Sequence, residues 1–529
     1  MDYYLSIHNM RTIFFLLLLP ISIFCLGQQE KNKQPNVLLI VVDDLNDYVG
    51  FLGGHPQTAT PAMDKLANES VIFTSAFSNN PICAPSRASF FSGLYPHTSK
   101  NFAFKKYQNN KTLSGSKTMM ELFMENNYRV AGTGKLMHHF DKSHYHDFKE
   151  KSDFGPFPYD GKKTIGHPSV PEPFRSVGAL DGSFAPLSDI PEVNGNKGWF
   201  DKVSNWPKFT VKPFRYNSDD DRDLMPDEVK LKEAIKFLKS FKENKEQPFF
   251  LGVGFNRPHT PLYVPEKYFK QFPLEDIQLP DNNSNTEKLK YGTQKEGNAG
   301  QRGFEHYAKL VASFGDDQDL ALRKYIQAYL ACIAFVDEQI GALLNELDNS
   351  EFAKNTIVVL VSDHAYVMGD KEYLYKNALW DKSTRIPMLI KDPRKGNSFR
   401  VANPVSLIDI YPTLIEMCDL KGTNIKNEFG KPLDGHSLYP FIQKKPKKFT
   451  GKPYALSAIT GGMGDVVNRN HFSIRTQKYR YIRYANHTEE LYDHTVDPYE
   501  KNNVAKEKKY RSIKNELEAM LDNELKPTN

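Results

Sequence analysis

Four stretches of the chain have the hydrophobic pattern of buried β-strands, and each ends in polar residues. Residues 35–44 (PNVLLIVVDD) and 355–364 (NTIVVLVSDH) are continuous apolar runs rich in β-branched side chains. Residues 128–139 (YRVAGTGKLMHH) and 247–259 (QPFFLGVGFNRPH) follow the same pattern. A continuous apolar run is typical of a strand that is buried on both faces of a parallel sheet. We therefore predict four buried strands of this kind.

Amphipathic helices are predicted between these strands, at residues 60–70, 116–127 and 226–241. Apolar strands that alternate with such helices indicate a large α/β domain. In an open α/β sheet, binding sites form in the crevice at the carboxyl ends of the strands. The polar residues that follow the four strands are therefore expected to converge on one place.

The pattern changes near residue 450. A basic linker, QKKPKKFTGKP, precedes short strands in residues 471–485 and 489–498 and a final helix in residues 509–525. We predict one large α/β domain over residues 28–445, which would hold the site at the ends of the strands. A smaller α+β subdomain with a short antiparallel sheet is predicted over residues 446–529.

The region from about residue 140 to residue 225 is rich in proline, glycine and aromatic side chains. Long irregular segments are uncommon inside a domain unless they are functional or disordered. Because of its aromatic content, we predict that this region is ordered and lies near a site.

The first 27 residues have the pattern of an export signal. Arg11 precedes the apolar run TIFFLLLLPISIFCLG, and the polar stretch QQEKNKQ follows. The run is too short for a stable membrane span, and Pro20 interrupts it. We predict a signal peptide over residues 1–27 and a mature protein that is periplasmic or secreted. A lipoprotein anchored through Cys25 is the alternative that the sequence leaves open.

Charge and cysteine content narrow the range of possible functions. The net charge of +5 is small for 529 residues and is spread along the chain, so nucleic acid is not predicted as a partner. Three of the four cysteines remain after removal of the signal. Cys332 and Cys418 lie in helical patterns and are predicted to pack in the core. Cys83 lies on a proline-flanked turn, PICAPSR, which indicates a different role.

Acidic residues end two of the predicted strands. Asp43 and Asp44 follow the first strand, and Asp363 with His364 follows the strand near residue 360. Such acids often do no more than cap a helix, and that reading remains open. Carboxylates gathered in one crevice repel one another unless a cation lies among them, and oxygen ligands favour Ca²⁺ or Mg²⁺. Zinc is not predicted, because no cluster of histidine and cysteine accompanies His364.

Basic residues lie at the ends of the other two predicted strands, and one more lies beyond the strand near residue 360. They are Lys135, His138, His259 and Lys376. A single histidine at the end of a strand is more often structural than catalytic. Together, however, the four side chains would make a cationic pocket beside the predicted metal, which suits an oxyanion. A histidine in this pocket can also give a proton to a leaving alcohol.

The string Cys83-Ala84-Pro85-Ser86-Arg87 resembles the signature of the type I sulfatases, in which the cysteine is oxidised to formylglycine. The resemblance extends over nearly all of the predicted mature chain. NVLLIVVDDL resembles the family's first metal-binding strand, GTGKLMHH its G-K-x-x-H element and RPHTPLYVP its histidine loop. SDHAYVMGD resembles the second metal strand, LYKNALWDKSTRIP the segment of the sulfate lysine, and LYDHTVDPYEKNNVA the C-terminal signature.

Within the family, the chain is most similar to the branch of iduronate-2-sulfatase and its bacterial polysaccharide relatives. His364 stands where many sulfatases carry asparagine, and Ala365 departs from the usual glycine after that histidine. We expect the alanine to alter the local turn rather than abolish activity. The resemblance implies an α/β, alkaline-phosphatase-like fold with a large mixed sheet flanked by helices and a smaller C-terminal α+β domain.

The resemblance also implies two cofactors. Ca²⁺ would be held by an oxygen of the modified Cys83 together with Asp43, Asp44, Asp363 and His364. The formylglycine aldehyde would be hydrated, so that one hydroxyl attacks sulfur and loss of the proton from the other releases sulfate. A formylglycine-generating maturation enzyme is therefore an implied partner.

The remaining residues receive roles from the same resemblance. Arg87 and Lys135 would orient the hydrate, and His138 would help to deprotonate it. His259 would protonate the departing sugar oxygen, while Lys376 would hold the sulfate. The implied activity is hydrolysis of sulfate esters on a sulfated polysaccharide or its oligosaccharides, with ulvan-like algal substrates expected first and glycosaminoglycans second.

Two other functions stay open at this point. A phosphate or phosphonate ester hydrolase could use the same formylglycine site, since the two oxyanions differ mainly in charge. A sugar-binding protein without catalysis would carry an unmodified Cys83, but it would need neither a leaving-group acid nor a base. A two-zinc phosphatase would need serine or threonine as its nucleophile and more metal ligands than the sequence offers.

Overall fold

The computed structural model describes residues 34–205, 208–280, 300–396, 398–462 and 466–526. The predicted signal peptide over residues 1–27, including Cys25, lies outside these ranges. Residues Pro35–Asn529 cluster into one compact unit. The boundary predicted after residue 445 stays a prediction.

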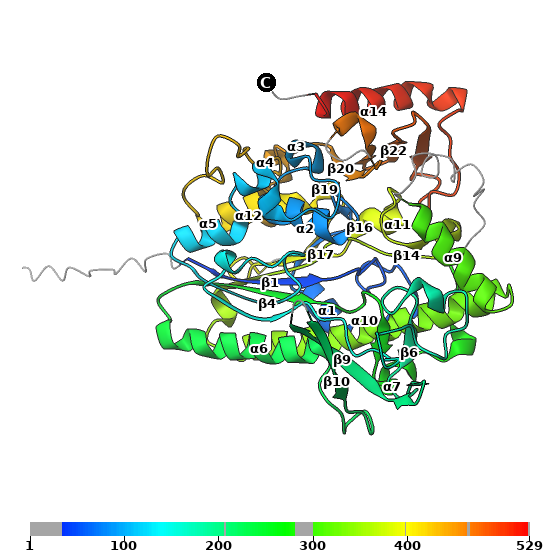
Figure 1. Ribbon diagram of the computed structural model, residues 1–529. Coiled ribbons are helices and arrows are strands. Elements are labelled where there is room, and N and C mark those ends of the chain that lie inside the picture. The colour runs from blue at the N-terminus through cyan, green and yellow to red at the C-terminus, as the bar shows by residue number, and fades with distance from the viewer. Residues whose placement is uncertain (1–33, 206–207, 281–299, 397, 463–465, 527–529) are drawn as a thin grey trace, which may run out of the picture. The chain divides into compact units, whose positions relative to one another are not determined.

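A sheet of eight strands lies at the centre of this unit (Figure 1). The four predicted strands are adjacent in it and parallel to one another, in the order β13, β1, β11, β4. Their bounds are Thr356–Ser362 (β13), Asn36–Val42 (β1), Phe249–Phe255 (β11) and Arg129–Gly134 (β4). Every residue of β1, β11 and β13 is buried. The prediction of buried parallel strands is confirmed.

The outer strands make the sheet mixed. Beyond β13 lie β17 (Met388–Lys391), β2 (Val71–Phe73) and β18 (Phe399–Val401), and beyond β4 lies β5 (Asp147–Lys151). β17 is antiparallel to both β13 and β2, whereas β18 and β5 are parallel to their neighbours. The predicted large mixed sheet is therefore present.

Helices cover both faces of the sheet, and β1 shows why. Its alternate side chains point to opposite faces, so that Leu38 and Ile40 join one apolar cluster and Val37 and Leu39 join another. The first cluster is completed by α1 (Pro61–Ala67), α6 (Pro226–Ser240) and α10 (Gln318–Asp348). The second is completed by α2 (Cys83–Ser92), α5 (Met119–Glu125) and α12 (Ile410–Cys418).

Helix α10 is the one helix among the described residues that is long and apolar enough to cross a membrane. In its most apolar window, 78% of the residues are buried inside the structure, which is typical of the core helix of a globular domain. Cys332 is buried in this helix, and Cys418 is buried at the end of α12. The predicted packing roles of both cysteines are confirmed.

A four-stranded antiparallel sheet and a terminal helix form the C-terminal part, as predicted. The strands are β20 (Tyr454–Ile459), β21 (His471–Thr476), β22 (Tyr479–Arg483) and β23 (Glu489–Asp493), and the helix is α14 (Arg511–Glu524). Their core includes Tyr95, Phe102 and Ile408 of the preceding chain. The C-terminal sheet therefore shares an apolar core with the catalytic part.

A buried ion network also ties this sheet to the catalytic part. Arg480 of β22 is fully buried; its Nε donates to Glu500 Oε1 at 2.5 Å, and its Nη2 donates to Asp381. Asp381 begins the short helix α11 (Asp381–Thr384), five residues after Lys376. Removing one member of such a network leaves charges buried without partners, which is strongly destabilising.

Arg480→Ala is expected to lower the free energy of unfolding by about 3–5 kcal/mol, because Asp381 and Glu500 lose a buried partner. Urea unfolding followed by circular dichroism measures this loss. The matched control is Arg483→Ala, which breaks a surface pair with Asp522 and should cost less than about 1 kcal/mol. Equal effects of the two substitutions would contradict a structural role for the buried network.

Candidate active site

Cys83 is the first residue of helix α2 and not, as the sequence suggested, part of a turn. Ile82 precedes it in extended conformation as the N-cap residue. Pro85 follows within the first helical turn, where a missing N–H costs no hydrogen bond. The prolines that suggested a turn therefore belong to a helix start, and they leave the side chain of Cys83 buried with only 2% of its surface exposed.

The sulfur of Cys83 lies between two predicted site residues. His364 Nε2 is 3.2 Å from Sγ, and Lys376 Nζ is 3.4 Å from it. Burial raises the pKa of the thiol, although the charges of Lys135 and Lys376 oppose the shift. A thiol whose pKa is raised is poorly ionised, and this disfavours a cysteine thiolate as the nucleophile.

Three buried aspartates surround this point, and each faces a cation. Asp43 receives hydrogen bonds from Lys135 and from Arg87 Nη2, the latter at 3.1 Å. Asp363 Oδ2 accepts from Arg87 Nε at 2.9 Å. The pKa of Asp43 is well below its usual range, because Lys135 and the other cations outweigh the effect of burial.

Asp44 is held differently. Lys376 Nζ lies 2.9 Å and 2.8 Å from its two carboxylate oxygens. Burial nevertheless raises the pKa of Asp44 to about 7, and Lys376 offsets only part of this rise. An added cation beside Asp44 would stabilise its ionised form further.

The backbone turns sharply after β1 to present Asp44 to the site. Asp44 has a φ of 61°, in the left-handed region that aspartate tolerates better than most residues. Its N–H donates to Asp363 Oδ1 at 3.4 Å, and its carbonyl accepts from the hydroxyl of Tyr329 at 2.7 Å. The conformation is thus fixed by β13 and α10, which are distant in sequence.

The donor set fits a hard divalent cation. Four buried residues each offer one ligand atom within 4.8 Å of the others: Asp43, Asp44, Cys83 and His364. Three of these four ligand atoms are oxygens once the cysteine sulfur is replaced by an oxygen, and this composition favours Ca²⁺ or Mg²⁺. Asp363 was predicted as a further ligand; its Oδ2 lies 3.5 Å from His364 Nε2, so it borders the same group.

His259 approaches the group from the loop after β11. Its Nδ1 lies 2.6 Å from the carbonyl oxygen of Thr260, so that an Nδ1–H donates there and Nε2 faces inward, 3.8 Å from Asp44 Oδ2. Burial and the charge of Lys376 hold the pKa of His259 well below its usual value. A bound anion beside the imidazole would act in the opposite direction and favour its protonated form.

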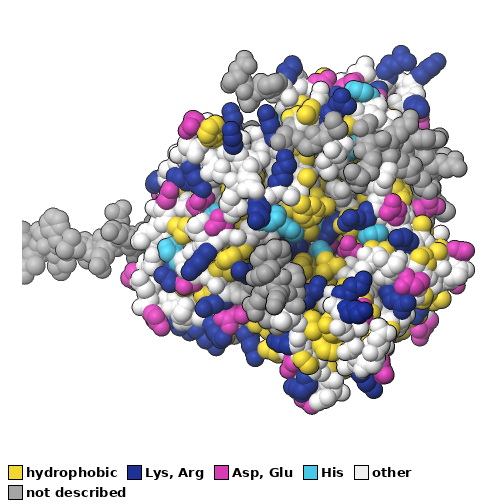
Figure 2. All heavy atoms as spheres, in the orientation of Figure 1, with side chains coloured by type: hydrophobic (Ala, Val, Ile, Leu, Met, Phe, Trp, Pro, Cys, Tyr) yellow, Lys and Arg dark blue, Asp and Glu magenta, His cyan; other side chains and the backbone are white. Residues whose placement is uncertain are grey.

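His138 is the one predicted site residue that is exposed. Its ring lies against Phe104 and His139, with centroids 5.1 Å and 4.9 Å away. Desolvation by the surrounding residues and the charge of Lys135 lower the pKa of His138 to about 3, which keeps the imidazole in the neutral form that a base requires. Its catalytic role stays a prediction. Figure 2 shows histidine, lysine and arginine side chains gathered around a hollow near the centre of the face in view.

Three neighbours of His259 were not predicted individually. The ring of Phe154 lies 4.8 Å from that of His259, and Lys135 Nζ is 5.0 Å from the centroid of Phe154. The hydroxyl of Thr260 donates to Asp181 Oδ1 at 2.9 Å. Phe154 and Asp181 belong to the region of residues 140–225, which was expected near a site from its composition alone.

At the carboxyl ends of the parallel strands, the site sets three buried carboxylates, of Asp43, Asp44 and Asp363, against the three cations Arg87, Lys135 and Lys376. This combination defines a hydrolase of oxyacid esters in the α/β class, because such esters need their charge neutralised while the leaving oxygen departs. Residues 35–420 match the family model described as Sulfatase, and residues 369–526 match the model described as N-sulphoglucosamine sulphohydrolase, C-terminal. The chain belongs to the sulfatase family, as its motifs predicted, and is a sulfuric ester hydrolase.

Relatives match over almost their whole length. A sulfatase of Formosa agariphila is 32% identical, with 97% of this chain and 92% of the relative covered. Mouse iduronate 2-sulfatase is 26% identical (91% and 93% covered), and an ulvan-active sulfatase of Formosa agariphila is 28% identical (94% and 82% covered). The iduronate-2-sulfatase-like branch is thus among the relatives.

Solved structures share the fold at lower identity. One was determined in complex with its substrate, D-glucosamine-2-N,6-O-disulfate; it is 20% identical with a TM-score of 0.65, and 93% of this chain and 98% of that chain are covered. A phosphonate monoester hydrolase from Silicibacter pomeroyi is 18% identical with a TM-score of 0.67, with 93% and 95% covered. At these identities the similarity establishes the fold but does not identify the substrate.

Proposed function

We propose that this protein removes sulfate from an anionic polysaccharide or its oligosaccharides, with Cys83 converted to formylglycine and with a bound Ca²⁺. The position of Cys83 carries the proposal, because its sulfur lies within 3.4 Å of both His364 and Lys376 inside a buried charge network. The names of the relatives, which include an ulvan-active sulfatase and iduronate 2-sulfatase, support a polysaccharide substrate. We propose ulvan-like algal polysaccharides as the first candidate substrates and glycosaminoglycans as the second.

We infer that the protein reaches this substrate outside the cytoplasm, as a periplasmic or secreted enzyme. The support is the export pattern of residues 1–27. A formylglycine-generating enzyme is the second partner of the proposal. Because Cys83 is only 2% exposed in the folded chain, this partner would have to act before folding is complete.

The proposed metal is held by Asp43, Asp44, Asp363 and His364 together with residue 83. Bound there, Ca²⁺ would act as a Lewis acid for the negative charge of the sulfate group. Formylglycine at position 83 would supply a hydrate with two hydroxyl groups, one as nucleophile and one to release sulfate.

The chain's own residues arrange the rest of the reaction. Lys376 Nζ, 3.4 Å from the sulfur of Cys83, is positioned to bind a sulfate oxygen next to the nucleophile. Arg87 and Lys135 hold Asp43 through hydrogen bonds, and each interacts electrostatically with residue 83. His259 presents Nε2 to the same point, because its Nδ1 is tied to Thr260, and is positioned to protonate the leaving sugar oxygen.

Chelation is expected to abolish turnover, and Ca²⁺ is expected to restore it better than Zn²⁺, because most of the proposed ligands are carboxylate oxygens. The measurement is hydrolysis of p-nitrophenyl sulfate after EDTA treatment, dialysis and addition of each metal. Metal analysis of active protein checks the result independently. Active protein that contains zinc and no calcium would contradict the proposed metal.

The proposed function is tested by assaying protein with confirmed formylglycine on matched esters. p-Nitrophenyl sulfate, p-nitrophenyl phosphate and a phenylphosphonate ester separate sulfatase activity from the alternative that uses the same site. A panel of defined sulfated oligosaccharides then identifies the sugar. Preference for the phosphonate ester over the sulfate, or absence of sulfate release from every saccharide, would overturn the proposal.

A further inference from the structure

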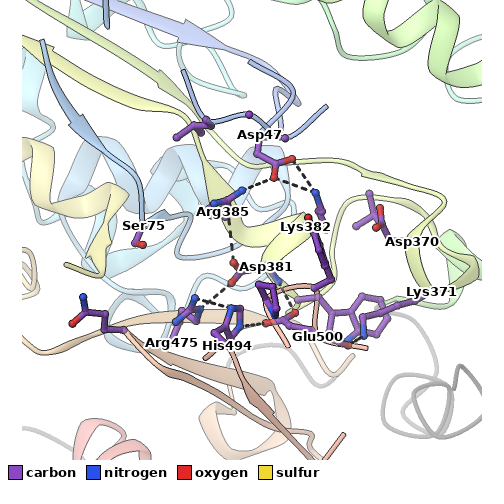
Figure 3. A pocket seen from close by; sticks show the side chains of 18 residues that line it. Asp47, Ser75, Asp370, Lys371, Asp381, Lys382, Arg385, Arg475, His494 and Glu500 are labelled. Atoms are coloured by element: carbon purple, nitrogen blue, oxygen red, sulfur yellow. Dashed lines mark hydrogen bonds and ion pairs between the residues drawn. The ribbon is translucent and has the colours of Figure 1, made fainter. Parts of the chain in front are cut away.

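A second cavity lies away from the cysteine site. Its volume is about 370 Å³, and its lining includes neither Cys83 nor any predicted metal ligand or catalytic residue. Three parts of the chain form its walls: the loop after β1 from Asp47 to Gly54, the segment from Asp370 to Arg385, and the C-terminal part around His494 and Glu500 (Figure 3). Small-molecule sites typically have volumes of about 300 to 1,000 Å³.

One wall of this cavity holds two cations around a single carboxylate. Lys382 Nζ lies 3.1 Å from Asp47 Oδ2, and Arg385 Nη2 lies 2.5 Å from the same oxygen. Two cations therefore share one carboxylate. Figure 3 shows the side chains of Lys382 and Arg385 converging on Asp47. This wall is suited to a further anionic group.

The opposite wall is neutralised within the protein. Asp381 and Glu500 are the acidic members of a possible metal-ligating group with His494. Arg475 and Arg480 already pair with Asp381, and Arg480 and His494 pair with Glu500. Because these carboxylates are already paired with arginines, we do not assign a metal to this group.

Asp370 offers an open carboxylate between the two walls. Its side chain makes no hydrogen bond or ion pair with another residue in the part of the chain that the structure describes, and Figure 3 shows it without such a link, although the charge of Lys382 acts on it. The side chain lines both this cavity and an adjoining one of about 280 Å³. A carboxylate in this setting can accept hydrogen bonds from the hydroxyl groups of a ligand.

Tyr499 supplies an aromatic surface where the two cavities adjoin. It lines both of them, and 62% of the residue is exposed. Lys382 Nζ and Lys501 Nζ lie 6.0 Å and 5.8 Å from the centroid of its ring. An exposed ring beside two ammonium groups combines an apolar contact surface with positive charge. It can therefore contact the apolar face of a ligand ring while the ammonium groups attract an anionic substituent.

We propose that this cavity binds an anionic sugar unit, with its ring against Tyr499, its sulfate or carboxylate near Lys382 and a hydroxyl group on Asp370. The class of ligand rests on the proposed function, because a polysaccharide substrate would present such units beyond the one being cleaved. The cavity would then hold a sugar unit away from the ester that the cysteine site hydrolyses.

Calorimetry with a short ligand tests this proposal. The protein carries Cys83→Ala to prevent turnover, and the probes are a sulfated uronate-containing disaccharide from ulvan, the same disaccharide after desulfation, and maltose. Two binding events are expected for the sulfated probe. Adding Tyr499→Ala should weaken one of them about tenfold, and adding Asp370→Asn should weaken the same event a few-fold.

The matched control is Phe429→Ala, which removes another exposed aromatic residue with a lysine, Lys111, beside its ring. Unchanged binding in this control and weaker binding in Tyr499→Ala support the proposal. Equal binding by Tyr499→Ala and the control, or equal binding of maltose, overturns it. Retained binding of the desulfated probe identifies the carboxylate as the recognised anion, and its loss identifies the sulfate.

An assay of hydrolysis separates an error in the second binding site from an error in the proposed function. Protein with an intact Cys83 and the Tyr499→Ala substitution should hydrolyse p-nitrophenyl sulfate at the parent rate, because Tyr499 does not line the cysteine site. If hydrolysis is present but the binding event is unaffected, the second site is wrong and the sulfatase assignment stands. If neither the parent nor the variant hydrolyses the sulfate, the proposed function fails.

Discussion

Cys83→Ala is expected to lower turnover of any sulfate ester on the order of a thousandfold or more, because it removes the precursor of the nucleophile. The fold should survive. Cys83 is buried, but the change deletes a single sulfur atom at the start of a helix, and the cavity left behind costs about 1 kcal/mol. Steady-state kinetics together with thermal unfolding separate the two effects.

Two matched variants sharpen this prediction. Cys418→Ala removes a similarly buried sulfur from the end of α12 and should leave turnover unchanged, since the Cys418 thiol lies in the core, where it interacts with Tyr128. Cys83→Ser should stop after one transfer of sulfate to the enzyme, because a serine sulfate has no second hydroxyl with which to release sulfate. Multiple turnover by Cys83→Ser would refute the need for a second hydroxyl. Turnover by Cys83→Ala within about tenfold of the parent would show that residue 83 is not the nucleophile.

His259→Ala is expected to lose about a hundredfold or more in kcat on a sulfated sugar and much less on p-nitrophenyl sulfate. A sugar alkoxide is a poor leaving group and needs a proton, whereas p-nitrophenolate leaves readily without one. The structure supports the acid role, because Thr260 fixes Nδ1 and leaves Nε2 facing the site.

Both substrates should be measured on one preparation with the same formylglycine content. A residue that only binds the substrate would change both activities by similar factors, mainly through KM. Equal losses on the two substrates would therefore move His259 from general acid to binding residue.

The strands that carry the site could be predicted because burial leaves a strong pattern. The apolar run of β1 continues to its last residue, Val42, and that of β13 ends one residue before Ser362, the last of the strand. Asp43 and Asp363 follow the two strands at once. The order of strands in the sheet then brings these ends together. Convergence of the polar residues followed from the general position of sites in α/β sheets.

Other parts of the site depend on contacts that no local pattern encodes. The left-handed conformation of Asp44 is held by Asp363 and Tyr329, which lie far away in sequence. The pairing of Lys376 with Asp44 likewise joins residues more than three hundred positions apart. Phe154 comes from a region whose composition predicted proximity to a site but could not indicate which side chain would face His259.

Cys83 shows how a local signal can mislead. Prolines at 81 and 85 suggested a turn, since proline interrupts regular structure in most positions. Within the first turn of a helix the same residue is compatible with the backbone, so α2 begins at Cys83 itself. The correction places the cysteine at a rigid, buried position and strengthens its assignment as a site residue.

We propose that activity requires conversion of Cys83 to formylglycine. The most direct test is mass spectrometry of the peptide spanning residue 83, in preparations made with and without a formylglycine-generating enzyme, alongside their rates of sulfate release. We expect the rate to rise in proportion to the fraction of peptide that is lighter than the cysteine form and reacts with a hydrazide, and to vanish where that fraction is zero. Full activity in protein whose Cys83 is entirely unmodified would contradict the claim.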